Sequence, residues 1–99
     1  MAAQINKISG STAVELISSL TKFNIKSISL ANIHDSDSVT VDLYLSDASN
    51  SYYILKNVVI PKGVTMFLED EFVEFERTVY SLYIKLGSGS STVDVIIRN

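Results

Sequence analysis

The sequence predicts an all-β protein: a single antiparallel β-sandwich, jelly-roll or immunoglobulin-like, of seven to eight short strands. Three observations support this prediction. Short runs with an apolar residue at every second position recur along the chain, and polar turn segments separate them about every 8–12 residues. No segment carries a long apolar pattern of helical period, so alternating strand and helix units have no room. Regularly spaced short strands are typical of sandwiches and barrels.

The clearest strands are predicted at residues 39–45, 78–86 and 92–98, where apolar and polar side chains alternate. Period two places alternate side chains on opposite faces, so each of these strands has one buried face. The residues expected to face inward are Val39, Val41, Leu43, Leu45, Tyr80, Leu82, Ile84, Leu86, Val93, Val95 and Ile97.

Polar turns separate the predicted strands. Residues 34–38 are rich in Asp and Ser, and we expect them to join runs 23–33 and 39–45 as a hairpin. The Gly-Ser segment 87–91 is expected to close a second hairpin. Pro61 and Gly63 mark a tight corner between runs 52–60 and 64–68, with Pro61 at the first central turn position and a positive φ at Gly63.

The N-terminal segment has two interpretations. Thr12 followed by Glu15 matches a helix capping box. Val14, Leu16 and Leu20 lie at even spacing, and Ser-Ser-Leu-Thr is a poor helix interior, so a strand is favoured. We expect one domain over residues 1–99, in which residues 1–20 form an extended N-terminal arm or an edge strand.

Composition argues against several classes of function. The chain has 99 residues, no cysteine and a net charge of −3, and its eight Lys and Arg are scattered, so we expect no nucleic-acid partner. No apolar run approaches the length of a membrane span, and the N-terminus lacks the order of a signal peptide, so we expect no membrane partner.

No group of side chains has the spacing of an active site. His34 with Asp35 and Asp37 could bind a metal, but a single histidine without cysteine is a thin zinc site and a turn explains it better. The acidic run 69–76 lacks the order of a calcium loop, and segment 87–91 lacks the lysine of a phosphate loop. We therefore expect no enzyme activity, no cofactor and no metal.

A protein interface is the favoured kind of site, because exposed tyrosines and an apolar residue on a polar strand face are typical of contact surfaces. Tyr44 and Tyr83 fall on the polar faces of their strands, and the neighbours Tyr52 and Tyr53 must point opposite ways, so that one can be core. Cross-strand pairing on the outer sheet face and carbohydrate binding are the alternatives for the tyrosines. The interface candidates are Tyr44, Tyr52, Tyr53, Tyr83, Glu69, Asp70, Glu71 and Ile96.

The order of these segments resembles a family of small β-sandwich virion proteins of tailed bacteriophages, particularly the contractile-tailed, myovirus-like phages. Ser27-Ile-Ser-Leu-Ala-Asn32, Ile60-Pro-Lys-Gly63 and the terminal Val93-Asp-Val-Ile-Ile97 carry the likeness, which spans about three quarters of the chain, residues 23–98.

The resemblance implies a non-enzymatic structural protein of the virion, assembled in the host cytoplasm. A capsid decoration protein is the first expectation, and a neck or tail component at the head–tail connection is the alternative. The implied partners are the major capsid protein or other virion proteins, and a homo-oligomer is compatible with this role.

Overall fold

The computed structural model describes residues 3–18, 25–47, 49–69 and 79–98, and in these ranges all regular structure is β-strand. None of the described residues belongs to a helix that could cross a membrane. The strands are β1 (Ala3–Ser9), β2 (Val14–Ile17), β3 (Ser27–Asn32), β4 (Val39–Ser46), β5 (Ser51–Ile60), β6 (Thr65–Glu69), β7 (Ser81–Leu86) and β8 (Thr92–Arg98).

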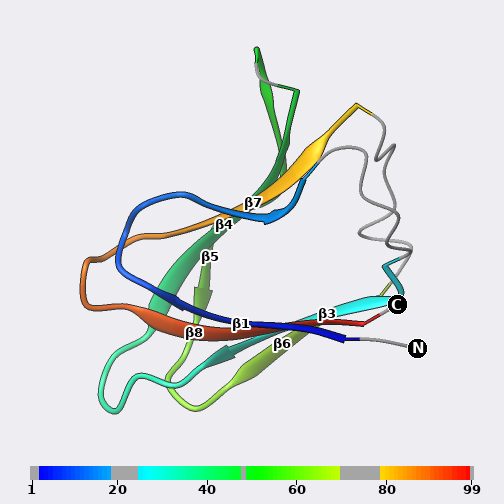
Figure 1. The fold of residues 1–99 in the computed structure, drawn as a ribbon. Helices are drawn as coiled ribbons and strands as arrows, with labels where there is room; N and C mark the ends of the chain where they lie inside the picture. Colours follow the sequence, from blue (N-terminus) through cyan, green and yellow to red (C-terminus); the bar gives the residue numbers. More distant parts are fainter. Residues whose placement is uncertain (1–2, 19–24, 48, 70–78, 99) are drawn as a thin grey trace.

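The strands form two four-stranded antiparallel sheets that pack as two layers (Figure 1). Sheet A has the order β1-β8-β3-β6 and sheet B the order β2-β7-β4-β5. Each strand pairs with its counterpart counted from the other end of the chain: β1 with β8, β2 with β7, β3 with β6 and β4 with β5. This nested order is that of an eight-stranded jelly roll, so the predicted all-β sandwich is confirmed.

Two of the predicted hairpins are wrong. Residues 33–38 carry the chain from β3 in sheet A to β4 in sheet B, and residues 87–91 carry it from β7 in sheet B to β8 in sheet A. The Pro61 corner likewise links sheet B to sheet A. Among the described strands, β4 and β5 are the one consecutive pair that forms a hairpin. Turn-forming residues satisfy the backbone equally well in a hairpin and in a connection between layers, so composition does not distinguish them.

The core lies between the sheets and consists of the inward face of each strand. Most of the predicted inward residues are fully buried, and this part of the prediction is confirmed. Leu45 and Tyr80 are half-buried, and they lie toward the end of sheet B at which β4 ends and β7 begins. The buried predicted residues are Val39, Val41, Leu43, Leu82, Ile84, Leu86, Val93, Val95 and Ile97.

The N-terminal residues form the outer strands of both sheets. β1 pairs with β8 at one edge of sheet A, and β2 pairs with β7 at one edge of sheet B. The segment that carried the capping-box pattern is therefore a strand. The Nε2 atom of Gln4 donates a hydrogen bond to the backbone oxygen of Leu16, which ties β1 to β2 across the two layers.

The Pro61 corner is a tight turn closed by a hydrogen bond from Val64 N to Pro61 O at 3.1 Å. Gly63 has a φ of 73°, so the predicted positive φ is confirmed. Pro61 is the first residue of this turn and not its first central residue, which corrects the predicted register. Gly63 N also donates to Asn32 O at 3.0 Å, which fixes the corner against the end of β3.

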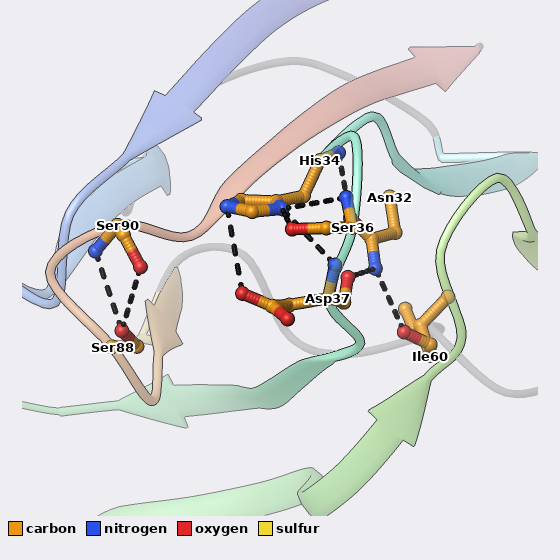
Figure 2. Close-up of polar contacts among 7 residues, drawn as sticks. All are labelled: Asn32, His34, Ser36, Asp37, Ile60, Ser88 and Ser90. Carbon is orange, nitrogen blue, oxygen red and sulfur yellow. Dashed lines mark hydrogen bonds and ion pairs between the residues drawn. The ribbon is translucent and has the colours of Figure 1, made fainter.

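Asn32 joins the two sheets at this end of the sandwich (Figure 2). Its side chain is 2% exposed, and its Nδ2 atom donates to Ile60 O at 2.9 Å and to Asp37 O at 3.0 Å. Its Oδ1 atom accepts from His34 N at 2.9 Å. One buried amide thus satisfies three backbone groups, as buried polar groups require.

Candidate functional site

The outer face of sheet A carries an apolar row that crosses all four strands. The strand registers place Ile5 of β1 opposite Ile96 of β8, Ile96 opposite Ser29 of β3, and Ser29 opposite Phe67 of β6. Side chains in register on neighbouring strands share a face. We call Ile5, Ile96 and Phe67, with Ser29 between the last two, the isoleucine–phenylalanine row.

The side chains at the two ends of this row are exposed to solvent. Ile5 is 74% exposed and Phe67 is 57% exposed, whereas Ile96 is half-buried. Ser29 is buried although it lies on the outer face, because Ile96 and Phe67 stand on either side of it. Neighbouring apolar side chains that are open to water are uncommon on a monomer surface, so this row is the candidate contact surface.

Charged residues flank the row on both sides. On one side Lys7 Nζ lies 2.6 Å from Asp94 Oδ1, an ion pair between β1 and β8. On the other side Arg98 of β8 and Glu69 of β6 occupy the same transverse row of the sheet, since each is in register with Ser27. An apolar centre with a charged rim is the usual arrangement of a protein–protein interface.

The sequence identified only one member of this row. Ile96 was predicted as an interface residue because it breaks the alternation of its strand, and it does lie on the outer face with Asp94 and Arg98. Ile5 and Phe67 were missed. A signal for Phe67 was present, because Met66, Phe67 and Leu68 form an unbroken apolar run, and such a run indicates a strand that is apolar on both faces.

The outer face of sheet B carries a row of tyrosines instead. Tyr83 of β7, Tyr44 of β4 and Tyr53 of β5 are in register across three neighbouring strands. The ring centroids of Tyr44 and Tyr83 lie 5.6 Å apart with an interplanar angle of 9°, and those of Tyr44 and Tyr53 lie 5.1 Å apart and tilted. We call these three residues the tyrosine row. Its rings pack against one another, as in the predicted cross-strand alternative.

The tyrosine row is reinforced by its surroundings. Partial burial, and then the neighbouring Tyr53 and Tyr83, raise the pKa of Tyr44 above its usual value. Lys56 Nζ lies 4.5 Å from the centre of the Tyr53 ring and 3.7 Å from Asp42 Oδ2. A cation over a tyrosine ring is attracted by the ring electrons.

A β-bulge shapes this edge of sheet B. Lys56 and Asn57 together oppose Asp42 of β4, and Asn57 has a φ of 53°. Asn57 N donates to Asp42 Oδ1 at 2.7 Å, which satisfies the backbone group that the bulge removes from the strand ladder. Bulges at an edge strand hinder pairing with strands of other molecules, so this edge is an unfavourable site for strand addition.

Of the remaining predicted interface residues, Glu69 flanks the isoleucine–phenylalanine row, whereas Tyr52 lies apart from both rows. Tyr52 packs edge-to-face on Tyr80, with ring centroids 5.8 Å apart, near the tip of the β4–β5 hairpin. Tyr52 and Tyr53 are 49% and 47% exposed, so the expectation that one of them is core is wrong. Asp70 and Glu71 lie outside the described residues.

His34 has a structural role in the connection from β3 to β4 (Figure 2). Its Nδ1 atom accepts hydrogen bonds from Ser36 N at 3.2 Å and Asp37 N at 3.1 Å. The ring nitrogen thus caps the turn as an Asp side chain would. The described residues contain no group of three or more His, Asp or Glu that could hold a metal ion.

The Gly-Ser segment 87–91 forms hydrogen bonds within itself. Ser90 N donates to Ser88 Oγ at 3.3 Å (Figure 2). Ser91 N donates to Ser88 O at 3.2 Å. These are local turn contacts at the connection from β7 to β8.

The chain folds as a jelly-roll sandwich. On the outer face of sheet B the tyrosine rings pack against one another, and on the outer face of sheet A Ile5 and Phe67 are exposed. No protein-family model matches the sequence, and no curated protein matches it. Among solved structures, the crystal structure of PirA is similar to this chain, with a TM-score of 0.57, 12% sequence identity, and coverage of 97% of this chain and 91% of that chain. At this identity the likeness concerns the fold alone.

Proposed function

We propose that this chain is a non-enzymatic structural protein of a bacteriophage particle, a capsid decoration protein that docks by protein–protein contacts. The observation that carries the docking role is the isoleucine–phenylalanine row on sheet A. Ile5 and Phe67 are exposed on the two edge strands of a sheet face whose flanks are charged. Covering these side chains removes apolar surface from water, which favours association.

The rigid scaffold supports an assembly role. Both outer strands of sheet A are held in register by pairing over their whole length, so the row is preorganised and a partner orders little on binding. Preorganised surfaces lose less entropy on association. An enzyme needs a concave site with convergent polar groups. Asn32 and His34 line an open pocket beside Gly63, but they use their polar contacts to hold backbone turns.

The place of the protein in a virion rests on the sequence resemblance to small β-sandwich virion proteins. Ser27–Asn32 and Thr92–Arg98, which carry that resemblance, are the two central strands of sheet A. The major capsid protein or another virion protein is the partner on the particle. A neck or tail component is the alternative within the same class, and it differs in copy number.

The tyrosine row gives weaker support to carbohydrate binding. Sugars stack on open aromatic faces, whereas the rings of Tyr44 and Tyr83 lie parallel and cover each other in part. The open apolar surface of sheet A is aliphatic except for Phe67, and it therefore suits a protein partner better than a glycan.

The test is the composition of purified particles from a culture that produces this chain. We expect the chain to remain with intact particles at a fixed copy number. Many copies spread over the surface support decoration, and a few copies at one vertex support the neck or tail. A chain that is found in the lysate and never in particles contradicts the proposal.

Two variants test whether the isoleucine–phenylalanine row is the docking surface. Phe67→Glu places a charge at one end of the row and is expected to reduce retention on particles. Glu15→Lys changes an exposed charge on the outer face of sheet B and serves as the matched control. Equal retention of both variants contradicts a docking role for sheet A.

A further inference from the structure

The geometry points to a second copy of this chain as the occupant of the outer face of sheet A. Two copies would pack these faces against each other about a twofold axis that is perpendicular to the strands. The inference rests on the proposed docking role of this face: in the free protein a second copy covers the row that the particle covers after docking.

The pattern along β8 is self-complementary. Its outer face presents Asp94, Ile96 and Arg98, an acidic, an apolar and a basic residue in order. A twofold axis through Ile96 and perpendicular to the strand reverses this order in the partner. Asp94 then faces the second copy's Arg98, Ile96 faces its equivalent, and Arg98 faces the second copy's Asp94, as an isologous interface requires.

The rest of the row follows the same symmetry. The axis runs along the row, so Ile5 and Phe67 each face their own equivalents and the apolar residues remain together. A twofold axis parallel to the strands would place Asp94 opposite Ala31 and Arg98 opposite Ser27, because β8 and β3 would exchange places. That arrangement gives Arg98 no opposite charge on the second copy, which costs desolvation energy, and leaves Asp94 with Lys7 of its own copy alone.

The charge balance of the face also suits a second copy. Lys7 and Arg98 balance Asp94 and Glu69, so the face is neutral, although the whole chain carries a net charge of −3. Two copies therefore meet without local repulsion at this face, whereas the acidic remainder of the surface disfavours unspecific contacts between copies.

The size of the face sets the strength of the dimer. Four strands of about 4.8 Å spacing and five to seven residues cover roughly 400 Å². Stable specific complexes bury about 800 Å² on each partner. We therefore expect a weak dimer that forms with rising concentration. Docking on the particle uses the same face, so the dimer dissociates when its copies attach.

The experiment is sedimentation equilibrium of the purified chain over a wide concentration range. Arg98→Glu sets two acidic residues against each other twice in the dimer, and Asp94→Lys sets two basic residues against each other twice. Each variant alone is expected to weaken the dimer at least tenfold. An equimolar mixture of the two variants is expected to restore it, because every opposed pair is then of opposite charge. Glu15→Lys is the matched control on sheet B and should dimerise like the wild type.

The outcomes separate this inference from the proposed function. A wild-type chain that stays monomeric at millimolar concentration, or a dimer that survives both single variants, overturns the inference. Failure of the mixture to dimerise overturns the twofold arrangement and with it the inference. Particle binding by a strictly monomeric chain, lost in Phe67→Glu, overturns the inference and leaves the proposed function standing. A charge-dependent dimer that never associates with particles supports the inference and contradicts the proposed function.

Discussion

The outer faces of the two sheets both carry large apolar or aromatic side chains, but they arrange them differently. Sheet B places three tyrosines in one transverse row, and their rings cover each other. Sheet A places Ile5, Ile96 and Phe67 in one row, and Ser29 separates the last two. The aromatic side chains are long enough to meet across neighbouring strands, whereas the short aliphatic chains and the intervening serine leave apolar surface in water.

This difference indicates that exposed apolar residues on a sheet are not equivalent. The tyrosine row is expected to stabilise the fold, and the isoleucine–phenylalanine row is expected to contribute to association. Substitutions can separate the two roles, since each row can be changed without changing the other.

The largest expected effect comes from removing the Asn32 side chain, whose hydrogen bonds connect the two sheets. Asn32→Ala leaves the carbonyl groups of Ile60 and Asp37 without their donor and His34 N without its acceptor. The bond to Ile60 O is buried and the other two are part-buried. A buried group without its partner costs about 1–3 kcal/mol and a part-buried one less, so we expect a loss of about 3–4 kcal/mol in unfolding free energy. Denaturant unfolding measures it, with the exposed Asn50→Ala as control. A loss below about 1 kcal/mol would show that the joint is not structural.

The next effect tests the tyrosine row directly. Tyr44→Ala removes both ring contacts, and each aromatic pair contributes about 0.5–1.5 kcal/mol beyond its buried area. We expect the unfolding free energy to fall by about 2–3 kcal/mol, with the dimer and particle binding unchanged for the folded fraction. Tyr44→Phe keeps the rings and should be nearly neutral. Loss of association in a folded Tyr44→Ala variant would contradict the division of roles between the faces.

Gly63→Val tests the corner that carries the chain from sheet B to sheet A. No atom lies within 4 Å of an added Cβ, so the whole cost comes from the φ of 73°. We expect a loss of about 1–3 kcal/mol in unfolding free energy. Gly89→Val, at an open position without a positive φ, is the control. An unchanged denaturation midpoint would mean that the turn is not the one described.

Ile5→Thr should have almost no effect on folding. Ile5 is 74% exposed and threonine keeps the β-branched shape, so the unfolding free energy should change by less than about 0.5 kcal/mol. The dimer should nevertheless weaken measurably. A destabilised monomer with unchanged association would reverse the roles assigned to the two faces.

The smallest effect is a pH dependence of sheet B. The pKa of Tyr44 is raised above its usual 10.0, first by burial and then by its tyrosine neighbours. Folding therefore favours the neutral tyrosine. This contribution to the unfolding free energy is fully present below about pH 10, where the unfolded tyrosine is also neutral, and it is lost as pH rises through the pKa of the folded state. The denaturation midpoint should decrease more between about pH 8 and about pH 11 for the wild type than for Tyr44→Phe. Equal shifts would show that Tyr44 does not contribute.

The candidate site was only partly accessible to sequence reasoning. Ile96 could be identified because it breaks the alternation of a clear strand. Ile5 could not, because β1 directs Gln4 and Asn6 inward, which inverts the usual assignment of polar and apolar residues. The tyrosines were recognised as outward-facing, but their packing against one another depends on the registers of β4, β5 and β7 and on the bulge at Asn57.

Local sequence patterns were enough to place β4, β7 and β8, most of their core side chains and the positive φ of Gly63. These properties are local, since period two and turn chemistry act within a few residues. The tertiary structure alone decided which strands are neighbours, because a hairpin and a connection between layers use the same turn residues. It therefore also decided that Ile5, Ile96 and Phe67 form one row, since residues so far apart in the chain share a row only through strand register.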